Sequence, residues 1–336
     1  MSKNSKTSLK ISIVIPTLNC AIILKKCLLS IKKQSYKNYE IIIADGGSTD
    51  KTLTLAKKYH CHIIKNSLKT AEAGKAVGVK AAKGEYVALI DSDNILPNKY
   101  WLSQMLLPFE DANIIGSEPI AFTYRKNAGF IERYSALLGA NDPYAYFSGN
   151  YDRHSYLSNK WTNIKIKTED KQSYLKLKIE DCILLPTIGA NGTLFKRDFL
   201  LKNIKGDYLF DIDILAQAKK PIYFAKVKNS IIHTFCESSI KKFFKKQNRR
   251  LTDYYHYRSL RHYQWTQNSK SISFALYSLL ILPALFDSFR GFIKKPDMAW
   301  FFHPLACFGT TLIYAHITIK YKLGLLKPLD RNKWQQ

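Results

Sequence analysis

Residues 11–90 alternate short apolar runs with stretches of helical periodicity, and this alternation constrains the fold more than any other feature of the sequence. The apolar runs predict strands at 11–15, 40–44, 62–65 and 86–90. Apolar residues recur every three or four positions between these runs, which predicts helices at 21–34, 50–59 and 70–82. Apolar strands that alternate with helices are typical of an α/β fold, in which helices cover both faces of a mostly parallel, Rossmann-like sheet. Residues 121–178 predict only a mixed, loop-rich insert, and regular patterns return at 188–195 and 221–235.

The sequence changes character from Glu237 onwards. A basic amphipathic helix is predicted first, and two apolar segments follow at 271–286 and 298–319. The second segment contains no Asp, Glu, Lys or Arg and is long enough to cross a bilayer. Positive residues flank both segments on every side, which conflicts with a simple two-span hairpin because one loop would face outward. We therefore favour helices that lie in the membrane interface. The alternatives are a span at 298–319 and two buried helices of a soluble domain.

The charge balance suggests a polyanionic partner. The chain of 336 residues has 52 Lys and Arg against 26 Asp and Glu, a formal net charge of +26. Nucleic acid, an anionic membrane and a phosphorylated ligand all fit this excess. None of the six cysteines forms a C-x-x-C pair, which suits a reducing compartment. The apolar run at 11–15 is too short for a signal-peptide core, so we expect the chain to begin in the cytosol.

Polar clusters follow three of the predicted strands, at 16–19, 45–50 and 91–94. Ligands of open parallel sheets bind beyond the carboxyl ends of the strands, so these clusters are expected to converge. Asp91 and Asp93 form a D-x-D motif, and their carboxylates point the same way if the backbone is extended. Hard oxygen ligands of this kind suit Mg²⁺ or Mn²⁺, which in turn bridge phosphate oxygens. The plainer alternative for any single cluster is an ordinary solvated turn.

Three segments resemble the family 2 glycosyltransferases of the GT-A fold: Ser12–Asn19, Ile43–Asp50 and Ala82–Asp93. A weaker resemblance continues through Gly189–Arg197 and Phe210–Asp213. It implies an inverting transferase that moves a sugar from a UDP- or GDP-sugar to a hydroxyl or phosphate acceptor. That acceptor would be lipid-linked or a precursor of an envelope glycan, as in polysaccharide biosynthesis. A divalent metal, Mg²⁺ or Mn²⁺, would stabilise the charge that develops on the leaving diphosphate.

The resemblance also implies roles for particular residues. The nucleotide would contact Pro16, Thr17, Asn19, Asp45, Gly74, Lys75 and Asp91. Asp93 would hold the metal, with Asp91 beside it. The loop near the donor sugar and the acceptor would be Gly189, Ala190, Asn191 and Gly192. Basic residues close to the diphosphate would come from Lys246, Gln247, Arg249 and Arg250, with a solvated or membrane-facing helix as the alternative.

The catalytic base is expected to be a carboxylate on the acceptor side. Relatives commonly show Glu-Asp at this place, whereas this chain has Phe210 followed by Asp211. We take Asp211 as the base and Asp213 as the reserve. The alternative for each is a helix cap or a first-turn acid.

These expectations divide the chain into two parts. Residues 1–236 would form the catalytic domain, with a nucleotide-binding half at about 9–120 and an acceptor half at about 121–236. Residues 237–336 would attach the protein to the cytoplasmic side of a membrane. A second enzyme class is a sugar-nucleotide nucleotidyltransferase. Against it, this chain has no Gly-rich loop with Lys or Arg after the first strand. A third class, a nucleic-acid-binding protein, predicts strongly salt-dependent binding but leaves the strand-end clusters unexplained, so no nucleic acid is expected.

Overall fold

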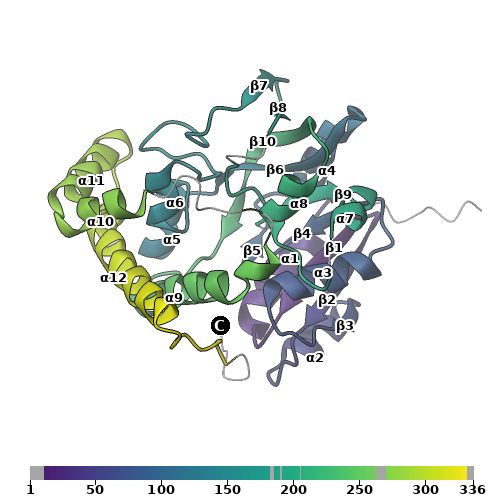
Figure 1. Cartoon of the computed structure of the whole chain (residues 1–336). Coiled ribbons are helices and arrows are strands. Elements are labelled where there is room, and N and C mark those ends of the chain that lie inside the picture. Colours follow the sequence, from purple (N-terminus) through teal and green to yellow (C-terminus); the bar gives the residue numbers. More distant parts are fainter. Residues whose placement is uncertain are drawn as a thin grey trace, which may run out of the picture.

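The computed structural model describes residues 11–181, 185–189, 191–204, 206–261, 263 and 270–330. Within these residues a ten-stranded sheet lies at the centre, in the order β3-β2-β1-β4-β9-β6-β10-β8-β7, and β5 pairs with β10 off this path. Helices lie on both sides of the sheet (Figure 1). The predicted mixed α/β fold with a central, mostly parallel sheet is confirmed.

The first half of the sheet is parallel throughout. It comprises β1 (Ile11–Thr17), β2 (Tyr39–Asp45), β3 (His62–Lys65) and β4 (Tyr86–Leu89). The connecting helices are α1 (Ala21–Lys32), α2 (Thr52–Lys58) and α3 (Ala71–Ala81), so every element predicted here is confirmed to within two residues. Alternate residues of β1 face opposite layers: Ile13 packs in the cluster that contains Leu28 of α1, whereas Val14 packs in the cluster that contains Val79 of α3.

Two glycines bring α3 unusually close to β1. A Cβ atom on Gly74 would lie 2.8 Å from Cβ of Pro16, and one on Gly78 would lie 2.2 Å from Cγ1 of Val14. Larger residues would push the helix away from the strand, because interiors packed at this density have no spare volume. Because Lys75 lies between these glycines on α3, the close approach also sets the distance of Lys75 from β1.

The second half of the sheet is mixed. Its elements are β5 (Asn94–Ile95), α4 (Trp101–Leu106), β6 (Ile114–Phe122), α5 (Phe130–Leu138), α6 (Pro143–Ser148), β7 (Lys167–Asp170), β8 (Tyr174–Ile179), β9 (Thr193–Lys196), α7 (Arg197–Asn203), α8 (Asp211–Gln217) and β10 (Ile222–His233). β9 runs antiparallel between β4 and β6. The insert predicted at 121–178 therefore holds two short helices and the hairpin β7–β8.

Strand β10 carries one extra residue against its neighbour β6. Val227 pairs with Pro119, but Ser230, three residues on, pairs with Ala121, only two residues on. Such a bulge reverses the alternation of side chains along the strand. Beyond it, the end of β10 pairs antiparallel with β5, where His233 lies opposite Asn94.

The C-terminal helices are α9 (Ile240–His256), α10 (Ser271–Leu279), α11 (Leu282–Lys294), the short 3₁₀ helix η4 (Met298–Phe302) and α12 (His303–Lys322). Helices α10, α11 and α12 lie on the side of the molecule away from β1–β3, whereas α9 extends from there toward the middle of the molecule (Figure 1). Trp300 and Phe302 share a buried cluster with Tyr134 of α5 and Phe243 of α9. The residues after 236 thus pack into one core with the preceding part of the chain.

The apolar segments differ in form from the continuous stretches read in the sequence. In the part of the chain that the structure describes, no single helix is both long and apolar enough to cross a bilayer. The pair α10 and α11 meets that test only jointly, and the two helices are bent by 82° where they meet. Membrane association stays a prediction.

Candidate active site

The ends of β1 and β2 are joined through Asp45, whose buried carboxylate accepts two hydrogen bonds at each oxygen. Its Oδ1 accepts hydrogen bonds from the hydroxyls of Thr17 (2.8 Å) and Ser48 (2.6 Å). Its Oδ2 accepts from the backbone N–H groups of Gly47 (2.8 Å) and Ser48 (2.7 Å). In this structure Asp45 therefore holds the loop after β2 in place. The predicted contact of Asp45 with the nucleotide base stays a prediction.

Asn19 fastens the same two loops together from the other side. Its backbone lies in the left-handed region, at φ 49°, which Asn tolerates better than most residues. The Asn19 Oδ1 accepts a hydrogen bond from the N–H of Thr49 (2.8 Å), and the Asn19 N–H donates to Ser48 (2.9 Å). These bonds bring two of the three predicted clusters to one edge of the sheet.

Lys75 lies between Asp91, which is predicted to contact the nucleotide, and Asp211, the predicted catalytic base. Its Nζ lies 3.0 Å from Oδ2 of Asp211 and 3.9 Å from Oδ1 of Asp91, and its side chain is only 4% exposed. Burial disfavours the charge of this ammonium, but Asp211 and Asp91 raise the pKa of Lys75 above its ordinary value. The lysine therefore remains a cation between two carboxylates that are far apart in the sequence.

Asp211 opens helix α8 and faces the loop that begins at Gly189. A Cβ atom on Gly189 would lie 1.9 Å from Cβ of Asp211, so only glycine fits there. Burial raises the pKa of Asp211 to about 6, although Lys75 acts in the opposite direction. A carboxylate with its pKa near neutrality is suited to accept a proton at physiological pH.

The reserve residue Asp213 lies elsewhere. It is buried, and its Oδ1 accepts a hydrogen bond from the N–H of Tyr263 (3.2 Å). Of the two candidate carboxylates, Asp211 is the one that the structure joins to Lys75.

Asp93 is paired with two residues that come from the C-terminal half of the chain. Its Oδ2 lies 3.2 Å from Nζ of Lys246 and 3.3 Å from Nε2 of His233. Burial alone would raise the pKa of Asp93, but His233 and Lys246 hold it well below its ordinary value. His233 is not among the residues predicted from the sequence; its only signal there is its place at the end of a strand-like run.

The residues around Asp93 fit a divalent cation whose remaining coordination positions are filled by a diphosphate. A carboxylate and an imidazole converge there, with Nε2 of His233 facing Oδ2 of Asp93. Asp91 stands at the same strand end. Among the described residues, no group of three or more His, Cys, Asp or Glu side chains forms a preassembled metal site. Mg²⁺ often takes only one or two protein carboxylates and leaves the other positions to phosphates and water, so this small set of ligands is suitable.

A small cavity lies beside the end of β1, at the predicted nucleotide site. It is lined by Pro16, Thr17, Leu18, Asn66, Lys69, Thr70, Ala71, Glu72, Arg249 and Asp253. The amide of Asn66 is buried: its Nδ2 donates to the carbonyl of Thr70 (2.8 Å), while its Oδ1 has no partner. An unsatisfied buried acceptor at a cavity wall is suited to receive an N–H group of a ligand.

The two adjacent arginines of α9 lie in different environments. Arg249 lines the cavity, and its contact with a diphosphate stays a prediction. Arg250 instead lies 3.4 Å from Oδ2 of Asp142 and also donates to Gln247. Gln247 in turn donates to the carbonyl of Asn141 (3.0 Å), so both residues brace the packing of α9.

The loop at 189–192 is held by contacts from two directions. The Nδ2 of Asn94, next to the D-x-D motif, donates to Oδ1 of Asn191 (3.1 Å). From the other side, Nη2 of Arg153 donates to the carbonyl of Asn191 (3.3 Å). Gly192 has φ +87° and packs against Trp101, a conformation and a space that favour glycine. Ala190 lies outside the described residues.

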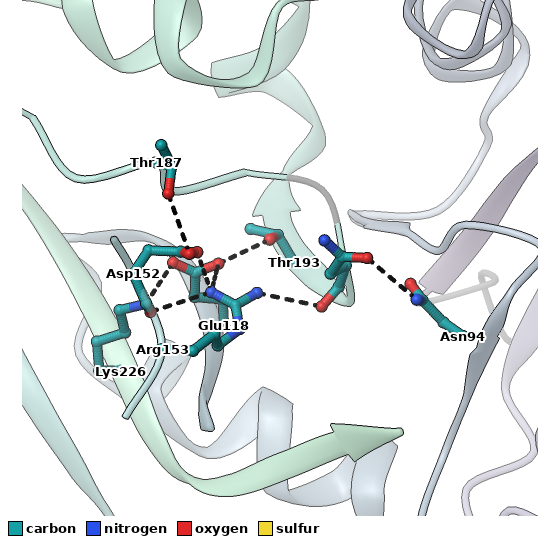
Figure 2. A network of polar contacts seen from close by, with 8 residues as sticks. Asn94, Glu118, Asp152, Arg153, Thr187, Thr193 and Lys226 are labelled. Carbon is teal, nitrogen blue, oxygen red and sulfur yellow. Dashed lines mark hydrogen bonds and ion pairs between the residues drawn. The ribbon is translucent and has the colours of Figure 1, made fainter. Parts of the chain in front are cut away.

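Arg153 belongs to a buried network of four charged side chains (Figure 2). Glu118 receives Nζ of Lys226 at 2.7 Å and Nη1 of Arg153 at 2.9 Å. Asp152 pairs with the same guanidinium, and Thr193 donates to Glu118 at 3.2 Å. Each charge faces opposite charges and hydrogen-bond partners, which is the condition for keeping ions in an interior.

Comparison with known proteins gives one family match. The family described as Glycosyl transferase family 2 matches residues 12–202, which include all three strand-end clusters and the loop at 189–192.

Individual relatives match over shorter stretches. Glycosyltransferase GlyG of Streptococcus pneumoniae is 36% identical over 92 residues, which cover 26% of this chain and 31% of that protein. The Escherichia coli protein WfaP, named UDP-Glc:alpha-D-GlcNAc-diphosphoundecaprenol beta-1,3-glucosyltransferase, is 33% identical over 133 residues, 38% of this chain and 49% of its own. The match therefore spans less than half of either relative. Among solved structures, mannosyltransferase PcManGT of Pyrobaculum calidifontis, in complex with GDP-Man and Mn²⁺, is 12% identical with a TM-score of 0.49, covering 92% of this chain and 88% of that one.

Proposed function

Because the chain belongs to glycosyl transferase family 2, we propose that it transfers a sugar from a UDP- or GDP-linked donor to a lipid-linked acceptor, with inversion at the anomeric carbon. We place this reaction at the cytoplasmic face of a membrane, on an envelope glycan precursor. The observation that carries the proposal is the contact of Lys75 with both Asp91 and Asp211, since it brings the donor side and the predicted base together.

In the proposed reaction, Asp211 removes the proton of the acceptor hydroxyl. The freed oxygen forms a bond to the anomeric carbon, and the bond from that carbon to the nucleoside diphosphate breaks. With its pKa at about 6, the Asp211 carboxyl is mostly ionised at pH 7 and ready to accept the proton. Lys75 favours that ionised form. A phosphate acceptor would already carry its charge and would need Asp211 less.

The donor would bind across the ends of β1, β2 and β4. Its base would enter the cavity beside Pro16, where the free Oδ1 of Asn66 offers an acceptor for a ring N–H. Uracil and guanine both present such a group. Arg249 lies on the wall of the same cavity and would face the phosphates.

Mg²⁺ or Mn²⁺ would be held by Asp93 and His233, with Asp91 beside them. When bound, the cation neutralises charge on the diphosphate, which makes it a better leaving group. Lys246 contacts Asp93 in this structure and therefore competes with a cation for the same carboxylate oxygen. The proposed acceptor chemistry is supported by the name of the E. coli relative, which specifies a diphosphoundecaprenol-linked sugar.

Calorimetric titration with UDP and with GDP, each with and without Mn²⁺, tests the donor site. We expect metal-dependent binding of one nucleotide, and Asp93→Ala should remove the metal-dependent part. Asp211→Asn should leave nucleotide binding intact and lower sugar transfer by about 10²- to 10⁴-fold. Near-normal transfer by Asp211→Asn would show that another group is the base. Binding of neither nucleotide would refute the proposed donor.

A further inference from the structure

The two helices α10 and α11 meet at a corner (Ser271–Lys294, here called the α10–α11 corner) whose large side chains face outward. On α11, Leu282, Phe286, Phe289 and Ile293 form a stripe at helical spacing. Leu282 is 73% exposed and Ile293 79%, and the two phenylalanines between them are also mostly exposed. The stripe would normally face a protein core, because apolar residues at this spacing form the buried face of an amphipathic helix.

The inward face of α11 is made of small residues instead. Ala284, Ser288 and Gly291 are buried, again at helical spacing. The ring of Trp300 packs so closely on Gly291 that a Cβ atom there would lie 2.5 Å from it. Apart from Phe292, which packs against the cluster of Trp300, the helix contacts the protein through small residues and presents large apolar residues to the surroundings.

The break between the helices continues this surface. Ile272, Leu276 and Leu279 on α10 are exposed at helical spacing, and Leu280 and Ile281 at the break are exposed too. Ile281 has φ 59°, a left-handed conformation that is strained for a β-branched residue. Strain of this kind persists where the surrounding structure imposes it, and here it places consecutive apolar residues at an exposed tip.

The charges beside this surface are predominantly positive. Residues 270–297, which include both helices and the turn after them, contain four Lys and Arg and two Asp. Asp287, the acid on α11, is already paired with Arg290 at 2.8 Å, and the Arg290 guanidinium lies 5.8 Å from the ring of Phe286 at the edge of the stripe. Lys270, at the start of α10, is exposed. An apolar stripe edged by cations is complementary to a bilayer with anionic headgroups.

We propose that the α10–α11 corner is a docking surface for an anionic phospholipid bilayer, in which both helices lie in the interface rather than cross it. The apolar stripe enters the outer part of the acyl region, and Lys270 and Arg290 meet the phosphates. This surface is separate from the nucleotide site, so it can be tested apart from the transfer reaction.

Flotation of the full chain with vesicles of phosphatidylcholine, with and without 30 mol% (roughly physiological) phosphatidylglycerol, tests the proposal. We expect wild type to float with the anionic vesicles and to bind the neutral ones about tenfold less. The double variant Phe286→Asp/Ile293→Asp should lose about 100-fold in partitioning, because each removed side chain contributes on the order of a tenfold gain in hydrocarbon. Ile22→Asp is the matched control, since Ile22 is 81% exposed but lies on α1.

Equal partitioning of the double variant and wild type would overturn the proposal, and so would failure of wild type to bind. Light scattering after size exclusion adds a further test: if wild type is a dimer that the double variant splits, the surface joins two copies instead. Nucleotide binding and thermal unfolding report whether the variant is folded. Should it not fold, Leu282→Trp supplies a second readout. Its added fluorescence should be quenched by shallow brominated lipids, and an unquenched signal would contradict the proposal.

Discussion

Replacing Lys75 with methionine gives the sharpest test of the charge arrangement at the site. The substitution keeps the length of the buried side chain but removes the cation that lies 3.0 Å from Asp211. Without that cation the ionised form of Asp211 becomes less favourable, so its pKa must rise above about 6. The pH at which transfer reaches half of its maximum should rise with it.

The size of the shift follows from the distance. Coulomb's law at 3.0 Å gives about 1.4 kcal/mol in water and about 5.5 kcal/mol at an effective dielectric constant of 20. At about 1.4 kcal/mol for each pKa unit, this range corresponds to a rise of roughly one to four units. Because the Asp211 side chain is 20% exposed, the lower part of the range is expected. In a plot of the transfer rate against pH, the midpoint of the acidic limb should then lie near pH 7 or higher, instead of near 6.

The assay is release of UDP or GDP at saturating donor, measured from pH 5 to 9 (a range of about two units on each side of neutrality). The position of the limb is the readout, because the rate itself also falls if Lys75 contacts the donor. Lys80→Met is the control: Lys80 lies on the same helix but pairs with Asp207 at the surface. An unchanged limb in Lys75→Met would refute the assignment of Asp211 as the titrating base.

Three further predictions concern other parts of the structure. Arg153→Met leaves Glu118 and Asp152 with one buried cation, so urea unfolding should show a loss of about 3–5 kcal/mol, and adding Glu118→Gln should restore part of it. Gly189→Ala should displace Asp211 and lower transfer about 100-fold while nucleotide affinity stays within a few-fold, and normal activity would contradict the close packing. Burial lowers the pKa of His303 to about 4, below its ordinary 6.5. The folded state should therefore lose up to about 3 kcal/mol of stability as the pH falls from about 6.5 to about 4. His303→Gln should flatten this pH dependence in thermal unfolding.

The sequence was sufficient for the elements of residues 11–90 because each of them is defined locally. An apolar run of four or five residues bounded by polar turns predicts a buried strand wherever it occurs, and the strand ends follow from it. Asp91 and Asp93 could be identified in this way because they directly follow β4. Their role as a charged cluster needed no knowledge of the rest of the chain.

The partners of these acids could not be identified, because the contacts join distant segments. Lys75 and Asp211 are 136 residues apart, and Lys246 and Asp93 are 153 apart. No local pattern specifies such pairs. The same holds for Glu118, whose charge suggests a surface position although the side chain is completely buried beside Lys226.

The neighbouring residues Arg249 and Arg250 show a further limit. Both were expected near the diphosphate, yet only Arg249 lines the cavity, whereas Arg250 pairs with Asp142. Adjacent residues of a helix point about 100° apart, so one basic pair cannot serve one site. Which of the two faces the cavity depends on how α9 is rotated about its axis, and tertiary packing sets that rotation.

The extra residue between Val227 and Ser230 makes this stretch of β10 intolerant of changes in length. Lys226 and His233 are seven positions apart, so in a regular strand they would face opposite sides, and the bulge turns them to the same side. Deleting one residue there would send the imidazole away from Asp93 while most of the ladder could still form. Related chains that keep this histidine should therefore carry the same number of residues between it and the lysine, whereas loops elsewhere are free to grow or shrink.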